Sequence, residues 1–256
     1  VPADPAARRQ YSFSRLSGAL HARPAVSEPA DALEEQAQPA EAARIDPLGL
    51  GTLVHAVLAE IEFGTPADVA ALVGRYAPLH LPDDGAGGQE AIELIGRFLT
   101  SRRAAEIAAA RQVYPEVEFL LAWPPEKRGQ APFFRQAGSQ HQGNVQEKAP
   151  VPFSPGRYLQ GFIDCLYQDA AGQWCVLDYK TNRVSQKTLG EVAAGYEMQM
   201  LLYALAVERI TGQAPSALVL HFLRPGLEHQ FAWDDAARKR VVELVSQSIA
   251  ALAGQG

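Results

Sequence analysis

The segment RYLQGFIDCLYQDAAGQWCVLDYKTN, residues 157–182, constrains the fold more than any other part of the chain. Its two β-rich runs, 158–167 and 174–180, flank the turn-forming DAAGQ and predict a β-hairpin. A helical pattern over about 188–211 and a buried-looking apolar strand at 217–226 follow. Strands that alternate with helices are typical of α/β folds. We therefore predict an α/β fold that contains this hairpin.

The remaining elements are predicted from the spacing of apolar residues. From Leu48 to Phe63 they recur at helical spacing, and this helix should end before Gly64. The other predicted elements are helices near 66–76, 88–110 and 234–253, and strands at 114–123 and about 227–233. Together they predict a central mixed β-sheet of about four or five strands, flanked by helices, with the hairpin aspartates at one sheet edge.

Two segments lack this regularity. Residues 22–47 are rich in Ala, Glu and Pro, so we interpret 1–47 as an N-terminal arm or linker and 48–256 as the main domain. Residues 124–157 carry six prolines and are predicted to form an inserted surface loop. Basic residues of the loop could contact a phosphate backbone or could be ordinary solvated charges, among them Arg128, Arg135 and Lys148.

Charge and composition exclude several classes of protein. The net charge of -6 gives no global basic field to gather DNA, so any nucleic-acid contact must be local or the strand must be delivered by a partner. No apolar run approaches the roughly 18 residues that span a bilayer. Only Cys165 and Cys175 are present, without a secretory leader, which favours the cytoplasm and two buried thiols over a disulfide or a metal pair.

The predicted hairpin brings together residues that could bind a metal. Asp178 and Lys180 lie two apart on one strand and share a face, whereas Tyr179 points the other way. Asp164 lies among apolar neighbours, where an unpaired carboxylate is costly to bury. Two carboxylates and the Tyr179 carbonyl suit Mg²⁺. Taken alone, the triplet of Asp178, Tyr179 and Lys180 favours an ordinary strand-end ion pair over a metal site.

Five segments in order resemble the motifs of the PD-(D/E)XK nuclease superfamily, specifically its RecB/AddA branch. They are GTLVH at 51–55, PEVEF at 115–119, GFID at 161–164, LDYKT at 177–181 and QMLLY at 199–203. YSFSRLSGAL at 11–20 also resembles a segment that precedes this domain in UvrD-like helicase-nucleases. The resemblance implies a restriction-endonuclease-like core.

The resemblance also implies roles for individual residues. His55, Asp164, Asp178 and the Tyr179 carbonyl would bind the metal, and Lys180 would position the attacking water.

Glu116 would be the catalytic glutamate of the strand, but Glu118 is a competing candidate because strand alternation puts both on one face. Gln199 and Tyr203 lie on one helix face and would support the active site or contact DNA. Structural or surface roles are expected for the other histidines, His21, His80, His141, His221 and His229.

The function implied is a metal-dependent nuclease that hydrolyses mainly single-stranded DNA within a helicase-nuclease of double-strand break repair. Mg²⁺ is the expected cofactor, with Mn²⁺ possible because imidazole is an acceptable ligand for it. ATP would act only in an attached helicase part. Two cysteines cannot supply the four ligands of an iron-sulfur cluster, so none is expected.

The expected partners are DNA ends, a helicase domain in the same or another chain, and a partner protein like AddB or RecC. Candidate residues for tracking the strand are Arg157, Arg183, Lys187 and Tyr196. The alternatives are a catalytically silent module that guides DNA or docks another protein of the complex, and a free-standing nuclease.

Overall fold

A computed structural model describes five stretches of the chain. They are residues 10–12, 45–81, 85–123, 133–136 and 157–253. Most of the predicted arm and insertion lies outside the described residues. The same holds for His21, His141, Arg128 and Lys148.

Seven strands form one mixed sheet in the order β3-β2-β4-β5-β6-β7, with β1 paired to β4. The strands are β1 Gln10–Ser12, β2 Gln112–Trp123, β3 Phe133–Gln136, β4 Arg157–Gln168, β5 Trp174–Lys180, β6 Ala217–Phe222 and β7 Leu227–Phe231. β4 and β5 are the predicted hairpin, and β5 pairs in parallel with β6. The parallel pair requires a crossover connection, which the helices after β5 provide. The predicted mixed α/β sheet is therefore confirmed, but the hairpin lies in the interior of the sheet and not at the predicted edge, because β2 pairs with β4 on one side and β6 pairs with β5 on the other.

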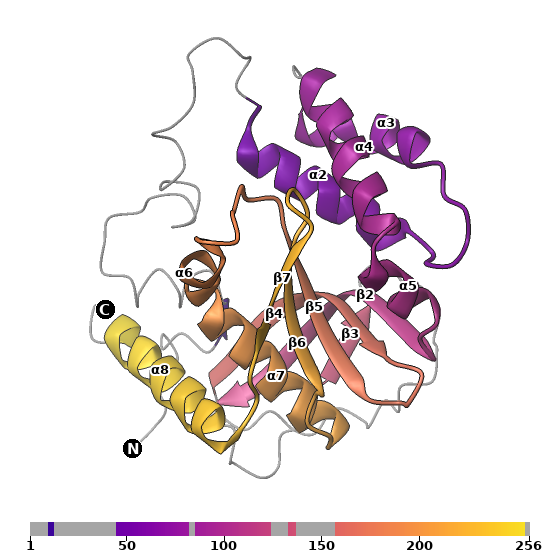
Figure 1. Ribbon diagram of the computed structural model, residues 1–256. Coiled ribbons are helices and arrows are strands. Elements are labelled where there is room, and N and C mark those ends of the chain that lie inside the picture. The colour runs from indigo at the N-terminus through magenta and orange to yellow at the C-terminus, as the bar shows by residue number, and fades with distance from the viewer. Residues whose placement is uncertain (1–9, 13–44, 82–84, 124–132, 137–156, 254–256) are drawn as a thin grey trace.

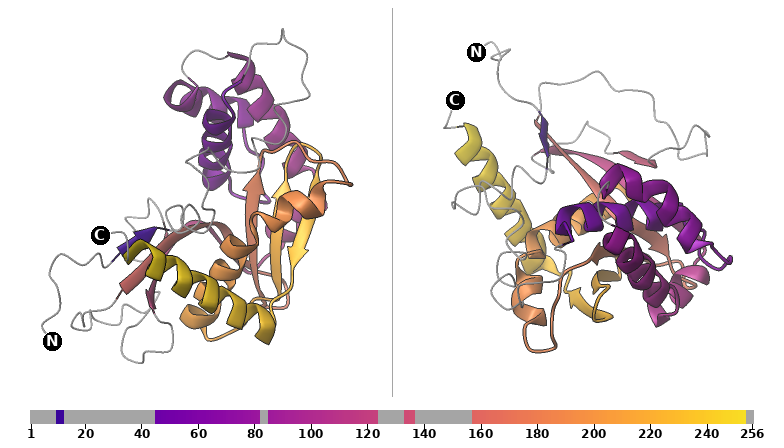
Figure 2. Two further views of the ribbon diagram at one scale, coloured as in Figure 1. Left: turned by 90° about the vertical axis from the view of Figure 1, so that its left-hand side faces the viewer. Right: turned by 90° about the horizontal axis from the view of Figure 1, so that it is seen from above.

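Helices cover both faces of this sheet (Figures 1 and 2). They are α2 Pro47–Glu60, α3 Val69–His80, α4 Gly85–Leu99, α5 Arg102–Ala108, α6 Leu189–Ala194, α7 Glu197–Thr211 and α8 Asp235–Ala253. Helices α2 to α5 form one layer and share an apolar core with one sheet face. Helices α6 to α8 cover the opposite face with a second apolar core. We call these the N-terminal layer and the C-terminal layer.

Two of the predicted helices are each divided in the structure, and two short strands were not predicted. The predicted helix at 88–110 is two helices, because Ser101 stops the first and caps the second by accepting from the Ala104 amide. The predicted helix at 188–211 is interrupted at Gly195 and Tyr196. Four residues of the predicted insertion form β3, and three of the predicted arm form β1. These two short strands raise the sheet from the predicted four or five strands to seven.

The side chains of strands β2 and β4 do not alternate regularly between the two faces of the sheet. Residues an even number apart on a strand normally share a face. Yet Val113 packs with the N-terminal layer and Val117 with the C-terminal layer. On β4, Ile163 faces the C-terminal layer and Cys165 the N-terminal layer. Between Val113 and Val117, Glu116 adopts a left-handed φ of 47°, which is rare for a residue with a side chain. Both strands thus change faces at the same level.

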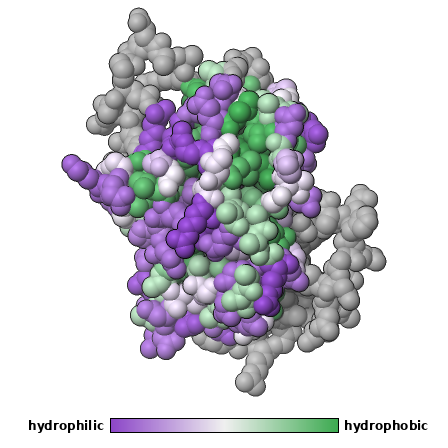
Figure 3. Space-filling view, turned by 45° about the vertical axis from the view of Figure 1, so that its right-hand side comes forward, coloured by the Kyte–Doolittle hydropathy of each residue, from purple (hydrophilic) through white to green (hydrophobic). Residues whose placement is uncertain are grey.

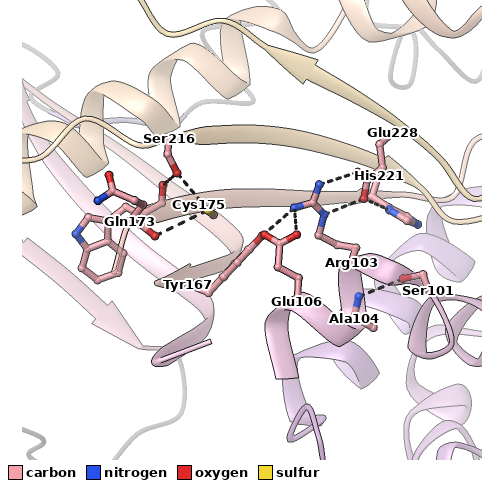
Figure 4. Close-up of polar contacts among 11 residues, drawn as sticks. Ser101, Arg103, Ala104, Glu106, Tyr167, Gln173, Cys175, Ser216, His221 and Glu228 are labelled. Carbon is pink, nitrogen blue, oxygen red and sulfur yellow. Dashed lines mark hydrogen bonds and ion pairs between the residues drawn. The ribbon is translucent and has the colours of Figure 1, made fainter. Parts of the chain in front are cut away.

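A polar network fastens α5 to the sheet (Figure 4). The Arg103 guanidinium donates two hydrogen bonds to Glu228 on β7, at 2.9 and 2.7 Å, and one to the Tyr167 hydroxyl on β4 at 2.9 Å. His221 lies 2.9 Å from the same Glu228 carboxylate. Burial alone raises the pKa of Glu228, but the Arg103 and His221 contacts outweigh it and lower the pKa to about 2. His221 is therefore structural, as predicted.

Apolar residues are not spread evenly over the surface that Figure 3 shows. In the view of Figure 3, apolar residues gather in the upper half, where the N-terminal layer lies in Figure 1. Cys165 and Cys175 are both free and buried, as predicted. Among the described residues, no helix combines the length and apolar character needed to cross a membrane.

Candidate metal centre

The candidate site lies where β4 and β5 separate. Their ladder ends at the pair of Cys165 and Leu177, although β5 continues to Lys180. In the gap, the Asp164 carboxylate accepts a hydrogen bond from the Tyr179 amide at 2.8 Å. The carboxylate thus satisfies a backbone donor that a strand would otherwise use. The opening lets side chains from both helix layers reach the sheet.

From the N-terminal layer, α2 contributes His55. Asp46 caps this helix by accepting from the amides of Leu48 and Gly49, and the helix holds His55 against the sheet. The imidazole Nε2 lies 3.0 Å from the Tyr179 carbonyl oxygen, and Nδ1 lies 3.3 Å from Asp164 Oδ1. Both nitrogens therefore face site acceptors, and the side chain remains 25% exposed.

Glu116 is the strand glutamate that reaches the site. One ligand atom each from His55, Glu116 and Asp164 lie within 4.8 Å of one another. The register places Glu116 opposite Asp164, between the pairs of Pro115 with Cys165 and Val117 with Ile163. The Glu118 carboxylate instead accepts a hydrogen bond from the Gln160 side chain. The left-handed backbone at Glu116 distinguishes two glutamates that regular alternation would make equivalent.

From the C-terminal layer, α7 holds Asp178. The Gln199 amide nitrogen donates to Asp178 Oδ1 at 3.0 Å and to the Tyr203 hydroxyl at 2.7 Å. Asp178 is 1% exposed, and its second oxygen, Oδ2, lies 3.0 Å from the Lys180 ammonium. Gln199 and Tyr203 thus orient the buried carboxylate from a helix, in accordance with their spacing of one turn.

Lys180 has a neighbour that motif spacing did not identify. Its ammonium lies 4.5 Å from the centre of the Tyr196 ring, a cation–π distance. The Tyr196 hydroxyl donates to the Asn182 side chain at 3.2 Å, and the ring is buried. Tyr196 therefore positions Lys180 instead of standing free to track a strand. The signal available was its place at the break before α7, directly ahead of the predicted Gln199 helix.

The electrostatics of the site are dominated by three crowded carboxylates. Burial raises the pKa of Glu116 to about 7 and that of Asp178 to about 6, and repulsion from Asp164 adds to both. Burial would lower the pKa of His55, but the Asp164 charge outweighs it and raises the pKa to about 9. Interaction with His55 likewise keeps the pKa of Asp164 below its ordinary value despite burial. The excess negative charge is a setting that a divalent cation would relieve.

The donor set fits a hard divalent cation. Such a cation prefers oxygen ligands and also accepts an imidazole nitrogen, and the Tyr179 carbonyl oxygen lies beside the His55 ring. Asp178 Oδ2 is buried, with the Lys180 ammonium as its ionic neighbour at 3.0 Å. Asp164 and Glu116 supply further oxygens within reach of His55.

The remaining candidates lie elsewhere. Arg183 and Lys187 are exposed on the segment after β5, and Arg183 lies 3.8 Å from Glu90 of α4. Of Arg135 and Arg157 only the strand positions are described, in β3 and β4. His80 ends α3 and His229 lies on β7, packed edge-on against Phe231.

Comparison with known proteins gives one family. The profile of the PD-(D/E)XK nuclease superfamily matches residues 29–255. The chain is similar to three bacterial proteins, each named as the A component of an ATP-dependent helicase/nuclease. It is 26% identical to that of Lysinibacillus sphaericus (strain C3-41) over 67% of this chain and 12% of the relative. It is 28% identical to that of Carboxydothermus hydrogenoformans (strain ATCC BAA-161 / DSM 6008 / Z-2901) over 68% of this chain and 14% of the relative. It is 33% identical to that of Bacillus velezensis (strain DSM 23117 / BGSC 10A6 / LMG 26770 / FZB42) over 54% of this chain and 10% of the relative. The chain therefore spans only 10% to 14% of the length of these relatives.

Proposed function

The chain belongs to the PD-(D/E)XK nuclease superfamily, and from this premise we propose that it hydrolyses phosphodiester bonds of DNA with a bound divalent cation. The observation that carries the proposal is the cluster of His55, Glu116 and Asp164, with Asp178 and Lys180 adjoining it. A buried group of three carboxylates would be costly without a cation to neutralise it. The proposed metal ligands are His55, Asp164, Asp178 and the Tyr179 carbonyl.

Mg²⁺ is the proposed ion, because oxygen donors predominate in this set. Mn²⁺ is the proposed substitute, because it accepts imidazole more readily. When bound, such an ion polarises a phosphoryl oxygen and lowers the pKa of a bound water.

The chain's own residues would then complete the chemistry. Asp178 and Tyr196 hold the Lys180 ammonium in place, by an ion pair at 3.0 Å and a ring contact at 4.5 Å. Lys180 would orient the attacking water and donate to an oxygen on which negative charge develops. Glu116, whose pKa lies near 7, could accept the proton of that water. Gln199 and Tyr203 would keep Asp178 aligned throughout.

We further propose that the substrate is mainly single-stranded DNA, supplied by a helicase during double-strand break repair. The relatives named as components of an ATP-dependent helicase/nuclease support this assignment. The net charge of -6 also favours a domain that is fed by a motor over one that captures DNA by itself. A helicase part, an AddB- or RecC-like partner and a cytoplasmic location belong to the same proposal, as does the division into residues 1–47 and 48–256.

The test is cleavage of end-labelled single- and double-stranded DNA with Mg²⁺, Mn²⁺ or EDTA. Wild type should cut with either metal and not with EDTA, whereas Asp178→Ala and Lys180→Ala should not cut. Asp235→Ala, which removes a 93% exposed carboxylate on α8, is the matched control. Intact DNA with both metals, for the domain and for a longer chain with its helicase part, would refute the proposal.

A further inference from the structure

Each residue of the GFID segment on β4 has a distinct environment. A Cβ on Gly161 would come within 2.6 Å of the Phe119 ring, so glycine is what allows that ring to lie so close to the strand. Ile163 is fully buried under the C-terminal layer, and Asp164 belongs to the metal cluster. Phe162, between them, is 45% exposed. The strand is therefore backed rigidly while it presents an aromatic ring to solvent.

Exposure of a large apolar side chain is uncommon in this chain. In the described part, three such residues stand out: Leu48, Leu79 and Phe162. Single exposed apolar residues are ordinary on protein surfaces. Phe162 differs because it lies two residues from Asp164 on the same strand, roughly 7 Å along it.

The ring also lies on the side of the sheet from which a substrate could reach the cluster. Ile163 faces the C-terminal layer, so Phe162 beside it on the strand points to the opposite side of the sheet. This is the side from which His55 contacts Asp164. In Figure 2 (left), β1 lies beside α8, clear of the N-terminal layer, and β1 pairs with β4 at residues 158–160. The sheet therefore extends beyond the N-terminal layer on the side of β1, and Phe162, two positions after the last residue of β4 that pairs with β1, is 45% exposed.

The neighbours of Phe162 favour a base over a phosphate. Its cross-strand partner is Glu118, whose carboxylate is held by the Gln160 side chain. A carboxylate repels phosphate, whereas a carboxylate and an amide can bind the polar edge of a base. Aromatic rings stack on any unpaired base, but bases inside a duplex are already stacked on one another.

We propose that Phe162 stacks on a base of the strand being cut, beside the scissile phosphate, and thereby favours single strands over duplexes. This inference rests on the proposed function, since it places the substrate at the same site. It assigns Phe162 a role in substrate selection and binding. Loss of one base stack weakens binding about 5- to 150-fold.

The first experiment measures binding without cleavage, by fluorescence anisotropy in EDTA. Phe162→Ala should bind a single-stranded thymidine oligonucleotide at least about 5-fold more weakly than wild type, and Phe162→Trp should restore the affinity. Leu79→Ala removes another exposed apolar side chain, from α3, and should bind as wild type does. Equal affinities for Phe162→Ala and wild type would overturn the inference.

A second experiment excludes a merely structural effect. An abasic oligonucleotide of the same length keeps every phosphate but offers no base. Wild type should prefer the thymidine strand, and Phe162→Ala should lose that preference. If the preference is unchanged in the variant, or absent in wild type, Phe162 is not a stacking residue. Cleavage that persists in Mg²⁺ would then leave the proposed function intact, whereas wild type that neither binds nor cuts would refute both.

Discussion

Replacing Asp178 by asparagine should raise the stability of the metal-free protein. The same substitution should abolish cleavage of DNA in Mg²⁺. Asp178 is 1% exposed, and burial together with repulsion from Asp164 raises its pKa from 3.8 to about 6. At about 1.4 kcal/mol per pKa unit, holding this carboxylate ionised costs up to roughly 3 kcal/mol of folding free energy. Asparagine keeps the oxygen that accepts from Gln199 but removes the charge.

The pKa of Asp178 determines how the stability difference between Asp178→Asn and wild type should change with pH. Between pH 3.8 and about 6 the folded protein holds a proton on Asp178 that the unfolded chain has lost. The contribution of Asp178 to wild-type stability should therefore fall as pH rises through this window. The Asp178→Asn variant should match wild type near pH 4 and exceed it at pH 8, by about 1–3 kcal/mol. For a domain of this size, that corresponds to a rise in Tm of roughly 2 to 10 °C.

The assay is thermal unfolding in EDTA at pH 4, 6 and 8, followed by circular dichroism. Asp235→Asn removes the same charge from a 93% exposed position and serves as the control. Adding Mg²⁺ should stabilise wild type, because a cation that binds only the folded state shifts the equilibrium, and should stabilise Asp178→Asn much less. A variant that unfolds below wild type at pH 8 in EDTA, or a difference independent of pH, would refute the reasoning.

Three further predictions concern the same strands. Glu116→Gln should slow cleavage in Mg²⁺ about 10²- to 10⁴-fold, because it removes the proposed proton acceptor, whereas Glu118→Gln should change the rate little; equal losses would contradict the assignment. Mg²⁺ affinity should rise with pH toward about 9, because the ion must displace a proton from His55, and His55→Gln should flatten this dependence over pH 7 to 9. Gly161→Ala should cost about 1–3 kcal/mol of unfolding free energy in urea titrations, because the new Cβ meets the Phe119 ring at 2.6 Å. Gly190→Ala on α6 meets nothing within 4 Å and is the control that should stay near wild type.

The sequence predicted the sheet well because its central strands are marked by local patterns. The hairpin turn and the parallel return to β6 follow from residues near one another in the chain. β1 and β3 have no such signal, since they are three and four residues long and form only by pairing with distant strands. Tertiary pairing of this kind overrides local propensity.

Motif order indicated which side chains belong together, but regular periodicity could not decide how they point. Alternation treats Glu116 and Glu118 as equivalent, and only the backbone reversal at Glu116 separates them. Tyr196 was missed as a partner of Lys180 because the break that places it follows no apolar period.

The opening between β4 and β5 has a consequence for how the protein is made. His55 meets Tyr179 across 124 positions of the chain, an interval that takes roughly 6 to 25 s to synthesise. Gln199 must follow before Asp178 is held. Contacts so distant in sequence form late in folding, after local helices and hairpins. A chain still being translated therefore carries α2 without its strands, and the proposed hydrolytic centre arises only when the sheet has closed around it.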